Sequence, residues 1–254
     1  MKTITALLFL VLSLVLYGSD EILDYYAPYI NEKGVVKKEH YIVAFNDHTL
    51  TPDWTIYAIL KPLQSVVKRD GLDFRKDPEF IKSPTDEKYK NCGFDAGHFV
   101  PAEDMSFDKK AIKDTFVTSN CAPQWGKFNR GIWKRLETQI RFWGNSGRRL
   151  VVLTGGVYRY NLRTINGIGL ADGFYKVVYF IDEDLTICYY FNHSADLSDD
   201  SNLNAYIVSI SELEKRIDIT LSRQPYNKDK RRDILNILAN RATGLARDSP
   251  NVKK

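Results

Sequence analysis

The chain has 254 residues, of which 44% are hydrophobic and 27% are charged, with 36 Lys and Arg against 32 Asp and Glu. These proportions exclude a disordered chain, a collagen-like chain and a membrane protein with several spans. The length predicts one large domain or two small ones, and the net charge of +4 permits an anionic partner without requiring one.

The chain begins with an apolar segment that follows Lys2 and runs uncharged from Thr3 to Gly18. It is too short to cross a bilayer comfortably but matches the hydrophobic region of a secretory signal peptide, and small residues follow it. We therefore expect residues 1–19 to be a signal peptide, the mature protein to be periplasmic or secreted, and the mature form to carry no stable membrane span. The alternative is an uncleaved anchor.

The next segment, residues 20–38, is polar and aromatic and is expected to wrap over the domain as a leader. Apolar, β-branched stretches then predict strands over His40–Phe45 and Trp54–Leu60. Residues 61–91 combine many charges with Gly and Pro and predict a long exposed loop, a type of segment that is usually functional.

A helix is predicted over Phe128–Trp143, because an apolar residue recurs at every fourth position. Glu137 and Arg141 lie four residues apart and are expected to pair on the exposed face of this helix. Gly and Asn in the segment 144–147 end it. The apolar stripe consists of Phe128, Ile132, Leu136 and Ile140.

Further strands and a helix follow along the chain. Because strands and helices do not alternate strictly, the pattern predicts one α+β domain over residues 20–254, with a mixed, mainly antiparallel central sheet and flanking helices. The capping box Ser211–Glu214 predicts the start of the helix. The strands are predicted over Leu150–Thr154, over the hairpin Tyr175–Ile181 and Leu185–Phe191, and over Ala205–Ile210.

The end of the chain, residues 224–254, forms a basic tail with eight Lys or Arg and three Asp. A helix is predicted within it, from about Lys230 to Arg241. The cations of this tail and of the loop at 61–76 could contact the phosphates of a nucleic acid, and the alternative is that both are solvated surface.

Three cysteines are present, and no zinc-binding, P-loop or G-x-S-x-G pattern accompanies them. In an oxidising compartment Cys92 and Cys121 could form a disulfide bond, and buried free thiols are the alternative. Cys188 lies within an apolar strand pattern and is expected in the core.

Several polar residues between 93 and 141 could support hydrolysis. The imidazole of His98 can take a proton from water near pH 7, while an amide oxygen and a carboxylate, as in Asn129 and Glu137, are ligands suited to Mg²⁺. Each residue taken alone also has a structural interpretation: a hydrogen-bonded His, a helix N-cap at Asn129, a surface ion pair at Glu137, and a turn at Asn120.

The order and spacing of three motifs add to this evidence. They read D-x-G-H-x-x-P-A-x-D over residues 95–104, S-N-x-x-P-Q over 119–124, and F-N-x-G-x-W-x-x-L-E over 128–137. Together they resemble the DNA/RNA non-specific endonuclease family, which has the ββα-metal (His-Me finger) fold and includes secreted bacterial nucleases and mitochondrial endonuclease G. Weaker similarity extends over most of residues 40–220.

The resemblance implies a role for each matching residue. His98 would be the general base that activates water, and Asn129 the one direct protein ligand of Mg²⁺, with Mn²⁺ as a substitute. Glu137 would orient water on the metal, Asn120 would support the site, and Arg141 would face the scissile phosphate. The implied substrates are DNA and RNA, and a homodimer is compatible with the resemblance.

One position departs from the family pattern, which usually has Arg where this chain has Ala96. Losing that cation would weaken transition-state stabilisation unless another cation, such as Arg130, replaces it. A further family Arg corresponds to Arg69, with Arg75 as the alternative. We expect an active endonuclease; the competing hypothesis is a catalytically weakened nucleic-acid-binding protein that acts in DNA capture or uptake.

Overall fold

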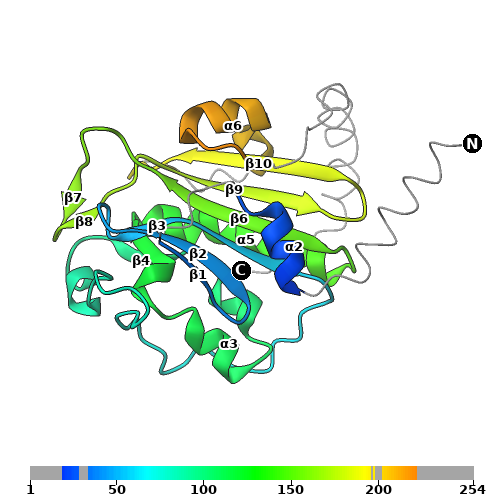
Figure 1. Cartoon of the computed structure of the whole chain (residues 1–254), viewed down its shortest axis with the longest axis horizontal. Helices are drawn as coiled ribbons and strands as arrows, with labels where there is room; N and C mark the ends of the chain where they lie inside the picture. The colour runs from blue at the N-terminus through cyan, green and yellow to red at the C-terminus, as the bar shows by residue number, and fades with distance from the viewer. Residues whose placement is uncertain (1–18, 29–33, 196, 198–201, 222–254) are drawn as a thin grey trace, which may run out of the picture.

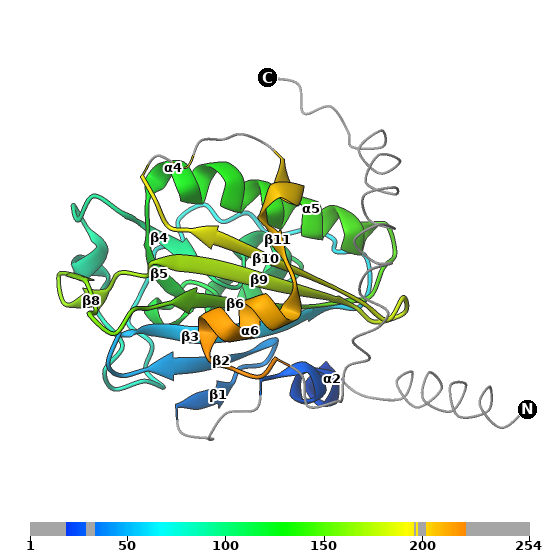
Figure 2. The same cartoon turned by 90° about the horizontal axis from the view of Figure 1, so that it is seen from above.

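The computed structural model describes residues 19–28, 34–195, 197 and 202–221, and its centre is a seven-stranded sheet (Figures 1 and 2). The strand order is β1-β2-β3-β6-β9-β10-β11, and all neighbouring strands are antiparallel. The predicted α+β class and mainly antiparallel sheet are confirmed. The strands are β1 (Val35–Lys37), β2 (Tyr41–Asn46), β3 (Thr51–Ile59), β6 (Leu150–Val157), β9 (Gly173–Phe180), β10 (Leu185–Asn192) and β11 (Ile207–Val208).

Alternating side chains divide the sheet into two apolar faces. In β2, Tyr41, Val43 and Phe45 enter one buried cluster, whereas Ile42 and Ala44 enter another. Because successive side chains of a strand point to opposite sides, helices must cover both faces to bury them. The sheet is therefore the middle of three layers.

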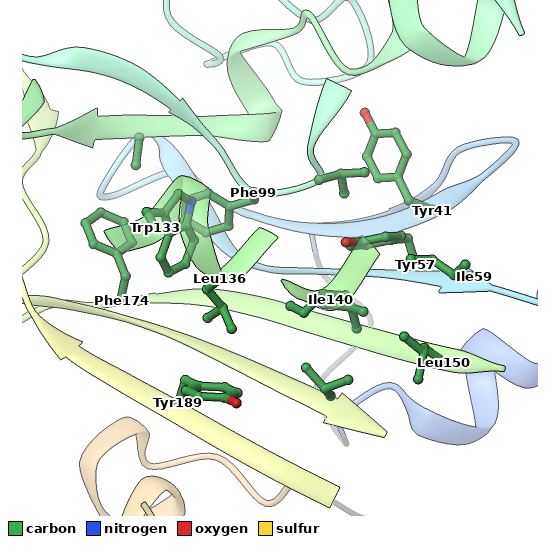
Figure 3. Close-up of a cluster of buried hydrophobic side chains, with 14 of the residues drawn as sticks. Tyr41, Tyr57, Ile59, Phe99, Trp133, Leu136, Ile140, Leu150, Phe174 and Tyr189 are labelled. Atoms are coloured by element: carbon green, nitrogen blue, oxygen red, sulfur yellow. The ribbon is translucent and has the colours of Figure 1, made fainter. Parts of the chain in front are cut away.

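One face is covered by helix α5 (Lys134–Asn145), whose Leu136 and Ile140 are completely buried (Figure 3). Burying such a side chain contributes about 2 kcal/mol. Near the end of the helix the backbone approaches β3 closely, since a Cβ on Gly144 would lie 2.6 Å from Cγ2 of Ile59. The predicted apolar stripe thus faces the sheet and fixes the helix on it.

The opposite face is covered by α2 (Ser19–Tyr26) and α6 (Ile210–Ile217), through buried residues such as Ile22 and Leu213. The segment predicted as a leader over the domain is therefore a packed helix followed by the edge strand β1. The predicted strand at 205–210 is mostly wrong, because residues 203–206 form the 3-10 helix η5 (Leu203–Tyr206) and only two residues join the sheet.

The start of α6 also differs from the prediction. The N-cap is Ser209, whose side chain accepts a hydrogen bond from the backbone N–H of Glu212 at 3.1 Å. Ser209 and Glu212 have the same S-x-x-E spacing as Ser211 and Glu214, so the N-cap lies two residues earlier than predicted, and the Glu212 side chain accepts from Arg216.

Most elements outside the large sheet are formed by the part of the chain that connects β3 to β6 (Figure 1). Residues 61–91 contain one short helix and are otherwise irregular, as predicted. These elements are η1 (Asp86–Tyr89), β4 (Asp95–His98), η2 (Ala102–Met105), α3 (Lys109–Asp114), η3 (Thr118–Asn120), β5 (Cys121–Gln124), α4 (Gly126–Phe128), the π-helical η4 (Asn129–Trp133), β7 (Thr164–Ile165) and β8 (Ile168–Gly169).

The three cysteines are not joined by a disulfide bond, and Cys188 lies in the core as predicted. Cys92 is half-buried and its thiol donates to the carbonyl of Tyr89 at 3.0 Å. The predicted signal peptide, apart from Ser19, and the basic tail at 224–254 lie outside the described residues. Within the described part of the chain, no helix is long and apolar enough to cross a membrane.

Candidate active site

The candidate site is built on a two-stranded ribbon and the helix that follows it. β4 pairs with β5 in an antiparallel register that places His98 opposite Cys121, and the chain then continues into α4, η4 and α5. Gly97 has no space for a side chain, since a Cβ there would lie 2.0 Å from Oε1 of the buried Gln124. A side chain at the position before the His would therefore displace the buried Gln124.

The imidazole of His98 lies between two phenylalanine rings, with centroids 4.6 Å from Phe74 and 4.9 Å from Phe116. Its Nε2 is buried and has no hydrogen-bond partner among the described residues. Burial, together with the positive charges of Arg69 and Lys176, lowers the pKa of His98 to about 3. The ring is therefore neutral near pH 7 and has a nitrogen available to accept a proton.

Asn120 is completely buried and holds the chain that follows His98. Its Oδ1 accepts a hydrogen bond from the N–H of Val100 at 2.9 Å, and its Nδ2 donates to the carbonyls of Val100 and Thr115 at 3.0 and 2.9 Å. Its own carbonyl accepts from the N–H of Phe99 at 2.9 Å. Because these bonds all go to backbone groups, Asn120 positions the end of β4 instead of pointing at a substrate.

Lys176 is a second buried residue behind this strand, and no role for it was predicted. Its Nζ donates to the carbonyl of Phe99 at 3.1 Å and to Oγ1 of Thr154 at 2.8 Å, and lies 4.5 Å from the centroid of the Trp133 ring. Burial lowers the pKa of Lys176 to about 8, although nearby carboxylates oppose the shift. The only sequence signal was a single cation within the apolar strand 174–180.

Asn129 lies beside the ribbon and is fixed by a carboxylate. Its Nδ2 donates to Oδ2 of Asp95 at 3.0 Å, and the same oxygen lies 3.2 Å from Nε of Arg130. Arg130 also donates to the carbonyl of Gly126 and leaves 74% of its side chain exposed. Asp95 therefore contacts both the predicted metal ligand and an exposed cation. Its place in the first motif did not indicate this role.

The helix around Asn129 is irregular. It begins at Gly126, so Asn129 is not its N-cap, and residues 129–133 are π-helical with a non-helical conformation at Gly131 (φ −97°, ψ −111°). Single π-helical turns inside α-helices occur frequently at functional sites. The helix predicted over Phe128–Trp143 is therefore interrupted by a π-helical turn before α5 begins at Lys134.

Glu137 is partly buried on α5, and this burial, together with the charge of Asp104, raises the pKa of Glu137 to about 7 against the opposing charge of Lys176. The predicted surface pair of Glu137 with Arg141 is wrong. Nε of Arg141 instead donates to Oδ1 of Asp104 at 2.7 Å, because the helix turns this face toward the protein.

The two alternatives for the upstream family Arg occupy different positions. Arg75 donates from Nη1 to the carbonyls of Lys113 and Phe116 at 2.7 and 3.2 Å, so it holds the end of α3. Cζ of Arg69 lies 5.7 Å from the centroid of the Phe116 ring, which contacts His98. Of the two, Arg69 is the one whose guanidinium lies beside a ring that contacts His98.

Ala96 lies in an apolar environment. Its side chain packs against a small cluster that contains Tyr89, Cys121 and Ile168. The methyl group of Ala96 carries no charge, so a cation that takes the place of the family Arg has to come from another residue.

The described residues contain no group of three or more His, Cys, Asp or Glu that could hold a metal ion. A site with Asn129 as the protein ligand needs no such group, since Mg²⁺ commonly keeps several waters and binds substrate phosphate. The hydrogen bond of Nδ2 to Asp95 leaves Oδ1 of Asn129 as the acceptor atom. An amide oxygen and a carboxylate, as in Asn129 and Glu137, are the donor types that suit a hydrated divalent cation.

Comparisons with known proteins agree with one another. A family model described as DNA/RNA non-specific endonuclease matches residues 19–227. The mitochondrial nuclease of Saccharomyces cerevisiae is 27% identical over 220 residues, covering 76% of this chain and 67% of that protein. Human mitochondrial endonuclease G is 28% identical over 157 residues, covering 56% of this chain and 52% of that protein, so the chain spans about half of its length.

A fungal relative and a solved structure extend the comparison. Nuclease C1 of Cunninghamella echinulata is 29% identical over 178 residues, covering 63% of this chain and 70% of that protein. A chain of the crystal structure of the EndoG/EndoGI complex matches with a TM-score of 0.71 and 23% identity, covering 81% of this chain and 91% of that one. The likeness in structure shows a shared fold.

Proposed function

The chain belongs to the DNA/RNA non-specific endonuclease family, and we propose that it is an exported endonuclease that hydrolyses DNA and RNA with a divalent cation, Mg²⁺ or Mn²⁺. The proposal is based mainly on His98, whose neutral imidazole can accept a proton. Its ring is neutral, its Nε2 has no hydrogen-bond partner among the described residues, and it shares strand β4 with Asp95, which orients Asn129.

His98 would act as the general base. A neutral imidazole can accept the proton of an attacking water, and no covalent intermediate is needed. A pKa of about 3 in the free protein makes His98 a weak base. A bound phosphodiester places a negative charge beside the ring, and an opposite charge favours the protonated form. Substrate binding would thus strengthen the base at the moment it is needed.

The remaining residues would stabilise the developing negative charge. A divalent cation held by Oδ1 of Asn129 would supply charge neutralisation at the phosphate and the leaving oxygen. The guanidinium groups of Arg69 and Arg141 would donate charge-assisted hydrogen bonds to phosphate oxygens. Glu137, partly buried and acidic, would accept hydrogen bonds from water in the site.

Recognition would be directed at the sugar-phosphate backbone. The candidate contacts are cations, among them the exposed Arg130, and cations of this kind contact phosphates. Contacts to phosphates do not distinguish base sequences. Because DNA and RNA share these phosphates, such contacts are in keeping with hydrolysis of both.

Ala96 supports a second candidate function, a nucleic-acid-binding protein with weakened catalysis. Its methyl group packs against an apolar cluster and carries no charge in place of the family Arg. The two functions are separated by incubating the purified protein with plasmid DNA and with RNA in Mg²⁺, Mn²⁺ or EDTA, and by measuring binding of the same substrates in EDTA. Cleavage in Mg²⁺ or Mn²⁺ supports the endonuclease; binding without cleavage in any metal supports the alternative.

The proposed export is based on the apolar segment at residues 4–16. It is tested by an experiment of its own. Two of the relatives are named as mitochondrial proteins, and mitochondrial targeting peptides are rich in Arg, whereas residues 1–19 contain one cation, Lys2. Expression of the full chain in a bacterial host, followed by fractionation and N-terminal sequencing, should yield a protein that begins near residue 20 outside the cytoplasm. An intact N-terminus in the cytoplasm would contradict export.

A further inference from the structure

A buried carboxylate connects the sheet, the loop after His98 and helix α5. Asp104 on η2 is completely buried, and its Oδ2 accepts a hydrogen bond from the hydroxyl of Tyr57 on β3 at 2.6 Å. Its Oδ1 accepts from Nε of Arg141 at 2.7 Å. Both oxygens are thus occupied by donors from elements that are distant in the sequence.

This arrangement restricts how the guanidinium of Arg141 can lie. Only Nε is used by Asp104, and neither Nη donates a hydrogen bond to another described residue. The side chain keeps 20% of its surface exposed, so part of it reaches solvent. A planar guanidinium held at Nε has one orientation, and its Nη groups then form a donor pair with the geometry that a phosphate accepts.

We propose that Asp104 is a positioning residue for the reaction: it fixes Arg141 through Nε so that the two Nη groups face the scissile phosphate, and Tyr57 keeps the carboxylate in place. This inference rests on the proposed function, because it assigns Arg141 a phosphate ligand. It adds a role for Asp104, a buried member of the first motif that would otherwise be only part of the core.

The proposal requires a carboxylate at position 104, because an amide offers one acceptor oxygen for the two donors, the hydroxyl of Tyr57 and Nε of Arg141. In Asp104→Asn the side chain keeps its size, and the Tyr57 hydroxyl can turn to accept from the new amide nitrogen. The bond to Arg141 loses its negatively charged acceptor, so the ion pair at Nε becomes a weaker hydrogen bond to a neutral amide. The guanidinium is then held less firmly in one orientation. Glu103→Gln is the matched control, since it removes the same charge from the adjacent, exposed residue.

The first experiment measures hydrolysis of a short oligonucleotide. Asp104→Asn should lower kcat by about 10- to 100-fold, the range expected when a transition-state donor is misplaced, with KM changed less than about threefold. Tyr57→Phe should give a smaller loss in the same direction, and Glu103→Gln should match wild type. Equal activity of Asp104→Asn and Glu103→Gln would overturn the proposal.

The second experiment separates positioning from a structural role. Arg141→Gly should regain activity when methylguanidinium is added, and the rescue should saturate because Asp104 binds the added cation. In the double variant Arg141→Gly, Asp104→Asn, rescue should be at least tenfold weaker at the same concentration. Equal rescue in both backgrounds, with both proteins folded by circular dichroism, would show that Asp104 does not orient the guanidinium.

A third measurement does not depend on cleavage. In a His98→Ala background, binding of thymidine 3′,5′-bisphosphate is compared for Asp104→Asn, Arg141→Ala and the double variant by calorimetry. The proposal predicts that each change weakens binding several-fold and that the double variant is no weaker than Arg141→Ala alone. Independent, multiplying effects would overturn it. A wild type that binds but never cleaves would refute the proposed function and leave this test intact.

Discussion

The low pKa of His98 has a consequence for stability that can be measured without substrate. In the unfolded chain the imidazole has its ordinary pKa of 6.5, whereas burial in the folded protein lowers the pKa to about 3. Below pH 6.5 the unfolded state therefore binds a proton at His98 that the folded state does not bind. The stability contributed by a neutral His98 is complete above pH 6.5 and is lost progressively as the pH falls toward 3.

The size of the effect follows from the two pKa values. Each pH unit below 6.5 costs about 1.4 kcal/mol at this site until the folded form also protonates. Between pH 7 and pH 5 the loss is about 2 kcal/mol, which is a substantial part of the 5–15 kcal/mol typical of a folded domain. His193, whose pKa is lowered to about 4 mainly by burial, contributes a separate loss.

The assay compares wild type with His98→Asn, which does not titrate, by urea unfolding at pH 7 and pH 5. His193 is present in both proteins, so its contribution cancels in the comparison. We expect wild type to lose about 2 kcal/mol more than His98→Asn over this range. Equal losses would refute the conclusion that His98 is held neutral in the folded protein.

Three further substitutions probe the ribbon. Gly97→Ala should destabilise the protein by about 1–3 kcal/mol in urea unfolding, because the new Cβ would lie 2.0 Å from Oε1 of the buried Gln124. Asp95→Ala should raise the Mg²⁺ concentration for half-maximal activity several-fold, since the amide of Asn129 loses its partner; an unchanged Mg²⁺ titration would argue against Asn129 as the ligand. Ala96→Arg should raise kcat/KM on plasmid DNA several-fold if no other cation already occupies that position, and no increase would indicate that one does.

Residues with a local signal could be predicted from the sequence. The strands at 150–154, 175–181 and 185–191 follow from β-branched and apolar runs, and the helical stripe from a period of four residues. His98 and Asn129 were found through the order of motifs. The strands and the helix depend on neighbours within one strand or one turn, whereas His98 and Asn129 depended on motifs spread over residues 95–137.

Residues whose role depends on distant contacts could not be predicted in this way. Lys176 contacts the carbonyl of Phe99 across 77 positions, and Arg141 reaches Asp104 across 37. Nothing in the local pattern around Glu137 showed that this face of the helix would turn inward, so the nearest opposite charge was taken as its partner. Tertiary packing decided these pairs.

The start of α6 shows the same limit on a small scale. Two overlapping S-x-x-E patterns begin at Ser209 and Ser211, and either could cap a helix. Packing selects the first, because a helix that begins at Ile210 buries Ile210 and Leu213 against the sheet. The boundary therefore depends on the core and not on the cap alone.

We propose above that His98 is the general base of a metal-dependent endonuclease. The most direct test is a time course of plasmid and RNA hydrolysis in Mg²⁺ and Mn²⁺ for wild type, His98→Ala and His48→Ala, which removes an exposed imidazole outside the site. The account predicts hydrolysis by wild type and His48→Ala, loss in EDTA, and a drop of at least 100-fold in His98→Ala. Wild-type rates in His98→Ala, or no hydrolysis by wild type in either metal, would contradict it.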